Sequence, residues 1–67
     1  MRIKTIQLFL LRLGYNCGEA NGIFGTATQN ALNEFQRDHN LPATPGIDNL
    51  TSDILESEAK RKGFRLI

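Results

Sequence analysis

Apolar residues recur every three or four positions in three stretches of the chain, which predicts three amphipathic helices. The first stretch spans residues 3–13, and Gly14 follows at a point where a glycine ends a helix at little cost because it has no Cβ. We expect Tyr15 to fold back over the last turn. The apolar face of this first helix comprises Ile3, Ile6, Leu10 and Leu13, widened by Leu8, Phe9 and Leu11.

Residues 16–25 separate the first helix from the second and are rich in glycine and asparagine. Three glycines and two asparagines lie in this segment. Because these residue types tolerate a positive φ, the segment is predicted to be a tightly turned loop. Ile23 and Phe24 are large apolar residues at its tip. We expect Ile23 to be buried in the core, whereas Phe24 is suited either to the core or to contact with a ligand.

The second helix is predicted to begin at Thr26, because Thr26 and Gln29 have the spacing of a capping box. In that motif the threonine hydroxyl accepts from a free helix amide, and the glutamine reaches back to the N–H of the cap. Asn40, before Leu41-Pro42, should end the helix. Its narrow apolar stripe consists of Ala27, Ala31, Leu32 and Phe35, opposite a polar face of Asn33, Glu34, Arg37 and Asp38.

A third helix can be capped by Asp48 or Asn49, because short polar side chains accept hydrogen bonds from the first free amides. Gly63 can end it, and its basic last turn favours the negative end of the helix dipole. The apolar positions are Leu50, Ile54, Leu55 and Ala59, and the basic ones are Lys60, Arg61 and Lys62. The apolar residues that follow should pack back on the helices or mark a cut from a longer protein: Phe64, Leu66 and Ile67.

The second half of the chain partly repeats the first. Each half has an apolar residue before a glutamine, a Gly-Ile pair in a turn, and a threonine four residues before a leucine. The corresponding residues are Ile6-Gln7 and Phe35-Gln36, Gly22-Ile23 and Gly46-Ile47, and Thr28 with Leu32 and Thr51 with Leu55. Such a repeat suggests that neither half buries its own apolar face. We therefore predict an all-α fold, a small three-helix bundle with a glycine-rich loop between helices 1 and 2, as one domain over residues 1–67.

The composition narrows what such a bundle can do. With one cysteine, Cys17, and one histidine, His39, the 67 residues provide neither an internal disulfide nor a Cys/His zinc site, and we expect no metal or other cofactor. A formal net charge of +1 is too balanced to attract nucleic acid. The apolar stretch of the first helix is far shorter than the roughly 20 residues of a membrane span, so no membrane insertion is expected. These residues also show no signal-peptide pattern.

An ordered set of short motifs extends over about residues 3–56: Ile6-Gln7, Leu10, Leu13-Gly14-Tyr15, Gly18, Asn21-Gly22-Ile23-Phe24-Gly25, Thr28, Ala31-Leu32, Phe35-Gln36, Leu41-Pro42 and Thr44-Pro45-Gly46-Ile47-Asp48, with Thr51 and Leu55. This order resembles the three-helix peptidoglycan-binding domain. The resemblance implies a non-catalytic module, expected to be monomeric, that tethers an amidase, muramidase or carboxypeptidase to bacterial peptidoglycan. It also implies a location in the cell wall or in extracellular or periplasmic space, or in the cytoplasm until release if the chain comes from a phage lysin.

Two positions depart from the pattern of that family. Asn21 stands where the family commonly has Asp, which removes a charge but keeps the turn chemistry. Ser52 stands where many members have Trp, which removes an aromatic surface for stacking on a ligand. The scaffold is also similar to the prodomain of matrix metalloproteases. That family's inhibitory cysteine segment after the last helix is missing here, because Cys17 lies in the first loop.

The loop around residues 15–28 is the predicted ligand site. Peptidoglycan offers sugar hydroxyls, N-acetyl groups and peptide carboxylates and amines, so a binder needs polar groups around an apolar floor. Backbone N–H groups of Gly22 and Gly25 near the start of the second helix are suited to an anionic or acetyl oxygen, and Phe24 with Tyr15 to the floor. The candidate ligand-binding residues are Tyr15, Asn21, Gly22, Phe24, Gly25, Thr26, Thr28 and Gln29.

A structural interpretation of these residues competes with the functional one. Asn21 and Gly22 suit the central pair of a tight turn, and Thr28 can form a hydrogen bond within its own helix. Gln7 and Gln36 are expected to satisfy backbone groups of the loops. Cys17 is expected to be a small buried residue, since no neighbouring cation or base would activate its thiol.

The sequence offers no catalytic residues. Glu34 and Asp38 lie one helical turn apart and are expected to be solvated, not held across a substrate as glycoside hydrolysis requires. His39 is expected to mark a helix end. Two other classes of function compete with wall binding: a protein-interaction or spacer domain, favoured by the missing aromatic residue at Ser52, and a DNA-binding domain that would use residues 60–65.

Overall fold

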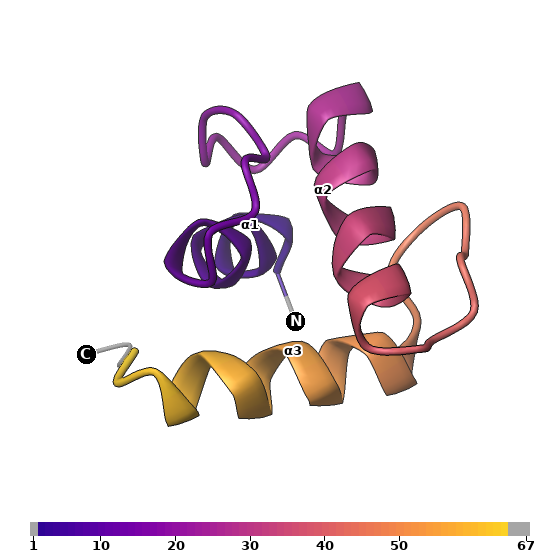
Figure 1. Ribbon diagram of the computed structural model, residues 1–67. Coiled ribbons are helices and arrows are strands. Elements are labelled where there is room, and N and C mark those ends of the chain that lie inside the picture. The colour runs from indigo at the N-terminus through magenta and orange to yellow at the C-terminus, as the bar shows by residue number, and fades with distance from the viewer. Residues whose placement is uncertain (1, 65–67) are drawn as a thin grey trace.

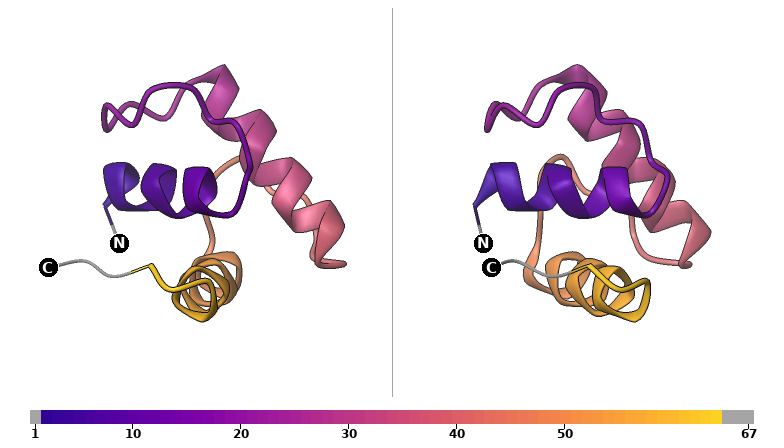
Figure 2. Two further views of the ribbon diagram at one scale, coloured as in Figure 1. Left: turned by 60° about the vertical axis from the view of Figure 1, so that its left-hand side comes forward. Right: turned by 90° about the vertical axis from the view of Figure 1, so that its left-hand side faces the viewer.

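Each of the three apolar stripes forms a helix. The computed structural model describes residues 2–64, with helices α1 (Ile3–Arg12), α2 (Thr26–Asp38) and α3 (Asn49–Arg61) and no strand in that range. Figure 1 shows that the helices cross one another. In Figure 2 the loop between α1 and α2 passes over the side of α1 that faces away from α3, so α1 is covered on both sides. The predicted all-α, three-helix architecture is confirmed.

None of the helices within residues 2–64 is long and apolar enough to cross a membrane.

The core lies where the three helices meet. Burial of each large side chain there contributes on the order of 1.5–3 kcal/mol relative to exposure. Most of the residues predicted from apolar periodicity are present, and Cys17 joins them from the loop, as expected for a buried thiol. The buried apolar residues are Ile6, Phe9, Leu10, Cys17, Ala31, Leu32, Phe35, Leu55 and Ala59.

Three residues predicted for the apolar faces are exposed instead: Leu11, Ala27 and Leu50. Leu50, for example, exposes 53% of its surface. Each of the three is the chain neighbour of a buried residue, and consecutive helical residues point about 100° apart. Because Thr51 and Leu55 fix the buried face of α3, Leu50 is turned away from it. The buried faces of the helices are therefore narrower than the apolar faces predicted from the sequence.

All three helices end with the same backbone hydrogen bond. The residue two positions after the C-terminal cap donates its N–H to a carbonyl in the last helical turn. The residue directly after the cap has a left-handed conformation, as in a Schellman motif. The left-handed residues are Gly14, Asn40 and Gly63, with φ of 91°, 57° and 90°. The bonds are Tyr15 N to Leu10 O at 2.8 Å, Leu41 N to Gln36 O at 2.8 Å and Phe64 N to Ala59 O at 3.0 Å. The predicted helix ends and the folding back of Tyr15 are confirmed.

The segment after α3 packs on α1, as predicted, as far as the described residues extend. The ring of Phe64 meets that of Phe9 edge to face, with centroids 5.0 Å apart. The Arg12 guanidinium also donates to the Lys62 carbonyl at 2.6 Å. Leu66 and Ile67, for which the same packing was predicted, lie outside the described residues.

The N-terminal caps of α2 and α3 differ. Asp48 caps α3, because its Oδ1 accepts from the Thr51 N–H at 3.0 Å, and hydrogen bonds from Thr51 lower the pKa of Asp48. The cap residue of α2 is Gly25, which has no side chain to accept a bond. The capping-box prediction for Thr26 and Gln29 is therefore wrong, although α2 does begin at Thr26. Gln29 instead bonds to residues farther along the chain.

A buried glutamine on α1 holds the loop that precedes α2. Gln7 Oε1 accepts from the Gly22 N–H at 2.8 Å, and Gln7 Nε2 donates to the Ile23 carbonyl at 2.9 Å and to Thr28 Oγ1 at 3.0 Å. Gln7 is 1% exposed. The amide thus joins α1 to the loop and to the first turn of α2, and it satisfies loop backbone groups as predicted.

Gln36, on the next helix, makes the same kind of contacts as Gln7. It is fully buried on α2, and its Nε2 donates to Thr44 Oγ1 at 2.9 Å and to Thr51 Oγ1 at 3.1 Å. Its Oε1 accepts from the Thr44 N–H at 3.3 Å. The internal repeat seen in the sequence therefore corresponds to a repeated contact, in which a glutamine on one helix holds the next loop and the threonine of the next helix.

Replacing Gln7 with leucine should destabilise the fold, because leucine keeps the approximate size of the side chain but leaves buried polar groups of the loop and α2 without their partner. We expect the free energy of unfolding to fall by about 2–4 kcal/mol in urea denaturation followed by circular dichroism. Ser57→Ala, at an exposed position of α3, serves as the control and should change it by less than about 0.5 kcal/mol. An unchanged stability for Gln7→Leu would contradict the role given to this amide.

Candidate functional site

The loop that precedes α2 is built from short-range turns. Asn21 Oδ1 accepts from the Ile23 N–H at 2.9 Å, and Gly22 between them has a φ of 84°, which strongly favours glycine. Asn21 and Gly22 therefore form the predicted turn. Ile23 was expected in the core, but 68% of its surface is exposed. Its carbonyl, not its side chain, is held by Gln7.

The backbone N–H groups proposed for an anion are engaged within the protein. The Gly22 N–H donates to Gln7, and the Gly25 N–H donates to the Ile23 carbonyl at 3.1 Å. Thr28 is likewise engaged, because its hydroxyl accepts from Gln7 on α1. Thr28 thus bonds to a residue of α1, a partner that the sequence did not predict. These three residues shape the loop from within.

Two shallow hollows flank the start of α2 and share Gly25 and Thr26. The first has a volume of about 410 Å³ and is lined by Phe24, Gly25, Thr26, Gln29, Asn30 and Pro45. The second has a volume of about 230 Å³ and is lined by Cys17, Gly18, Glu19, Asn21, Ile23, Gly25, Thr26, Ala27 and Thr28. Six of the eight predicted ligand-binding residues thus line one hollow or both. Tyr15 and Gly22 line neither of the two.

The first hollow lies between two loops that are distant in the sequence. Gln29 brings them together, because its Nε2 donates to the Thr44 carbonyl at 2.9 Å and to Asn33 Oδ1 at 2.9 Å. The bond to Thr44 places Pro45 beside α2. At Gly25, an added Cβ would meet no atom within 4 Å, so the first hollow is open at this residue.

Two residues of the first hollow were missed by the sequence-based prediction. Asn30 lies four positions after Thr26, so helical spacing places it on the same face and could have identified it. The sequence contained no such signal for Pro45, since its position depends on the bonds that Gln29 and Gln36 make to the neighbouring Thr44.

The second hollow contains the only cysteine. The Cys17 thiol is 3.4 Å from the Gln7 carbonyl oxygen, and burial raises the pKa of this thiol, so it stays protonated at neutral pH. The cysteine therefore contributes packing, as predicted. Glu19 is the one charged side chain among the residues that line either hollow.

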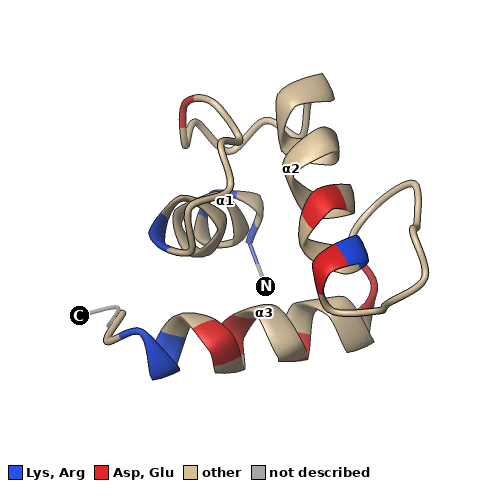
Figure 3. Ribbon diagram, viewed as in Figure 1, with Lys and Arg blue, Asp and Glu red and all other residues tan. Residues whose placement is uncertain are grey.

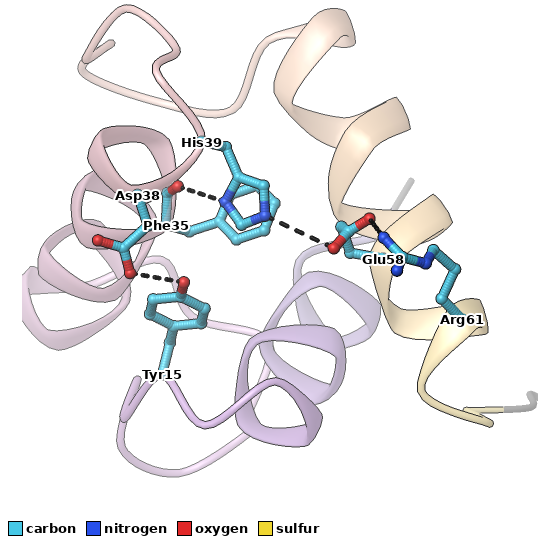
Figure 4. A network of polar contacts seen from close by, with 6 residues as sticks. All are labelled: Tyr15, Phe35, Asp38, His39, Glu58 and Arg61. Carbon is cyan, nitrogen blue, oxygen red and sulfur yellow. Dashed lines mark hydrogen bonds and ion pairs between the residues drawn. The ribbon is translucent and has the colours of Figure 1, made fainter.

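Tyr15 belongs to a separate cluster at the other end of α2, shown in Figure 4. Its hydroxyl donates to Asp38 Oδ2 at 2.8 Å, and its ring packs edge to face on Phe35 with centroids 5.6 Å apart. Tyr15 was expected to form a ligand floor with Phe24, but these contacts place it elsewhere. Asp38 and Glu34 are exposed, as predicted.

His39 completes this cluster and is the C-terminal cap of α2, the role predicted for it. Its ring lies over that of Phe35 at 4.1 Å, and its Nδ1 is 2.9 Å from the Phe35 carbonyl oxygen. Its Nε2 faces Glu58 of α3 at 3.7 Å. The pKa of Glu58 is lowered by Arg61, which is 2.9 Å away, and by His39. The cluster therefore connects the end of α2 to α3.

The fold and the two hollows define a small helical module with a polar, open site and no acid–base pair among the residues that line them. Comparison with known families identifies the family of this module: the family described as "Putative peptidoglycan binding domain" matches residues 2–55. The chain belongs to this family, whose members are non-catalytic modules that bind peptidoglycan. The family indicates peptidoglycan as the partner and the cell wall or extracellular space as the location. No curated protein and no solved structure matches the chain.

Titration of Tyr15 tests the cluster at the end of α2. Burial and the hydrogen bond to Asp38 raise the pKa of Tyr15 to about 12. Because the folded-state pKa lies above the unfolded value of about 10, the stability from this contact is complete below pH about 10 and is lost as the pH rises towards about 12. Tyr15 is the only tyrosine and tryptophan is absent, so the ultraviolet absorbance of the phenolate reports this residue alone.

Asp38→Asn should move that titration midpoint down towards the value of a free tyrosine, because it removes the carboxylate that accepts from the phenol. Glu19→Gln, which removes a loop carboxylate lining the second hollow, is the matched control and should leave the midpoint unchanged. A wild-type midpoint near that of free tyrosine would show that the contact with Asp38 does not form in solution.

Proposed function

We propose that this chain binds peptidoglycan and holds an attached or associated wall hydrolase, such as an amidase, a muramidase or a carboxypeptidase, close to its substrate. The family match carries the proposal, because it covers α1, α2, both loops held by glutamines and the first half of α3. In this proposal residues 1–67 act as a single monomeric module, located in the wall or in extracellular or periplasmic space, or in the cytoplasm before release of a phage lysin.

The proposed contact surface is the first hollow. Phe24, which is half-buried, and Pro45 supply apolar surface, and Thr26, Gln29 and Asn30 supply polar groups around it. Among the predicted ligand residues, Phe24, Gly25, Thr26 and Gln29 remain in the proposal at this hollow, and Asn21 and Thr28 at the neighbouring one. Tyr15 and Gly22 support the fold instead.

The alternative of a DNA-binding domain has no support in the charges of α3. Lys60 pairs with Glu56 at 2.9 Å and Arg61 with Glu58 at 2.9 Å, so two of the three basic residues of the last turn are paired. A protein-interaction or spacer domain remains the competing function, and it is an outcome of the binding test.

Sedimentation with insoluble, purified peptidoglycan tests the proposal. The protein should appear in the pellet, and complete recovery in the supernatant at low salt would overturn wall binding and favour the spacer domain. Fusion to a wall amidase should increase cleavage of insoluble walls but not of soluble muropeptides, because targeting acts only on an immobile substrate. Equal stimulation on both substrates would contradict the targeting role.

Phe24→Ala should reduce the amount of protein bound to peptidoglycan, because it removes the aromatic surface of the first hollow. We expect a loss of affinity of roughly fivefold or more, which corresponds to about 1 kcal/mol for a side chain that anchors a ligand. Leu11→Ala, which truncates a leucine of α1 that is 41% exposed and lines neither hollow, should bind like the wild type. Equal losses in the two variants would remove the first hollow from the proposal.

A further inference from the structure

The chemistry of the first hollow distinguishes between the two components of peptidoglycan, the glycan strand and the stem peptide. Resting on the proposed function, we infer that the first hollow takes an N-acetylated sugar of the glycan strand and not the stem peptide. Three features carry this inference: the absence of charge from the lining, the kinds of polar atom that it presents, and the rigidity of its walls.

The lining of the first hollow is uncharged. All six of its residues have neutral side chains. Between Leu13 and Asn33 the sequence contains one charged residue, Glu19, which lines the second hollow. In Figure 3 the beginning of α2 and the loops beside it are almost entirely tan, whereas the charges lie on α1, α3 and the later turns of α2.

Stem peptides carry carboxylates and, in many walls, amines. Recognition of a carboxylate normally uses Arg, Lys or an array of backbone N–H groups. Here no Arg or Lys lines the hollow, and the N–H groups of Gly22 and Gly25 are already engaged within the protein. The hollow therefore offers a charged stem peptide no ion pair, and the backbone N–H groups at the start of α2, which Gly25 leaves without a side-chain cap, suit the carbonyl of a neutral acetamido group.

A sugar ring suits the same surface. Its C–H face is apolar and matches Phe24 and Pro45, while its hydroxyl and acetamido groups need neutral donors and acceptors. Both hydrogens of the Gln29 amide are used on Asn33 and Thr44, so its oxygen is left to accept from a hydroxyl or an acetamido N–H. Asn30 is exposed and offers both a donor and an acceptor.

The walls of the hollow are formed before a ligand arrives. Gln7 fixes the loop on one side, Gln36 fixes the loop on the other, and Gln29 joins the second loop to α2. Fixed walls reduce the ordering cost of binding, which matters for a neutral ligand that gains no ion pair.

The two halves of the repeat differ at this place. From the turn glycine to the helix cap there is one intervening residue in the second half, Ile47, but two in the first, Ile23 and Phe24. The cap is Asp48 in the second half and Gly25 in the first. The first half thus has an added aromatic residue and lacks a carboxylate, and both changes favour a neutral, partly apolar ligand.

Nuclear magnetic resonance titrations with two probes test the inference on the intact chain. The N-acetylglucosamine tetramer should shift the signals of Phe24, Thr26 and Asn30, equally at low and high salt, whereas a free stem tetrapeptide should not. Shifts at these residues with the peptide alone would overturn the inference, and so would sugar-induced shifts confined to residues outside the hollow.

A pair of substitutions at Gly25 gives a second test, because asparagine and aspartate have the same shape and differ in charge. Both are good helix caps, the backbone at Gly25 has a φ of −101°, and the added Cβ meets open space, so Gly25→Asn and Gly25→Asp should not lower Tm. Both should project into the hollow and reduce retention on peptidoglycan, with affinities within about twofold of each other if the ligand is neutral.

Other outcomes at Gly25 contradict the inference in specific ways. A much larger loss for Gly25→Asp than for Gly25→Asn would indicate a carboxylate ligand, and tighter binding by Gly25→Asp would indicate an amine. Unchanged retention for both would show that the hollow is not the contact. Failure of the wild type to sediment with intact peptidoglycan overturns the proposed function itself, whereas sedimentation without a response to the sugar tetramer overturns only the identity of the ligand.

Discussion

One buried amide, that of Gln7, determines where the first loop lies and therefore the shape of the surface beside α2. A domain of this size buries only about 60% of the surface that its unfolded chain exposes, so its core cannot also enclose the loop tips. Ile23 illustrates this limit, because its side chain lies mostly in solvent while its carbonyl is held by Gln7. Polar contacts to the backbone take the place of apolar packing, and Gln36 does the same for the second loop.

Much of the fold could be predicted from sequence because its signals are local. Apolar periodicity located the three helices, and the residues with positive φ that end them, Gly14, Asn40 and Gly63, are of types that favour this conformation. The repeated glutamine and threonine indicated a repeated contact. One error arose where a partner is distant in the chain: Gln29 has capping-box spacing with Thr26, yet it donates to the Thr44 carbonyl.

The candidate site could be predicted only in part, for the same reason. Residues 24–29 are contiguous and the helix keeps them together, so the sequence indicated most of them correctly. Tyr15 is near them in sequence, but the end of α1 turns it towards Phe35 and Asp38. Pro45 is distant in sequence and reaches the hollow because Gln29 and Gln36 hold the neighbouring Thr44 by hydrogen bonds. Periodicity within one element cannot show which side of a neighbouring element a residue meets.

The two glutamines that hold the loops determine how the loops respond to the acidity and ionic strength of their surroundings. A bacterial wall contains fixed carboxylates that concentrate protons and counterions, so the acidity and ionic strength inside it differ from those of the surrounding medium. Ion pairs at the loops would weaken as counterions screened them or as a carboxylate took up a proton. The amides of Gln7 and Gln36 neither titrate nor attract counterions. The bonds that these two glutamines make to the loops should therefore be insensitive to local acidity and ionic strength.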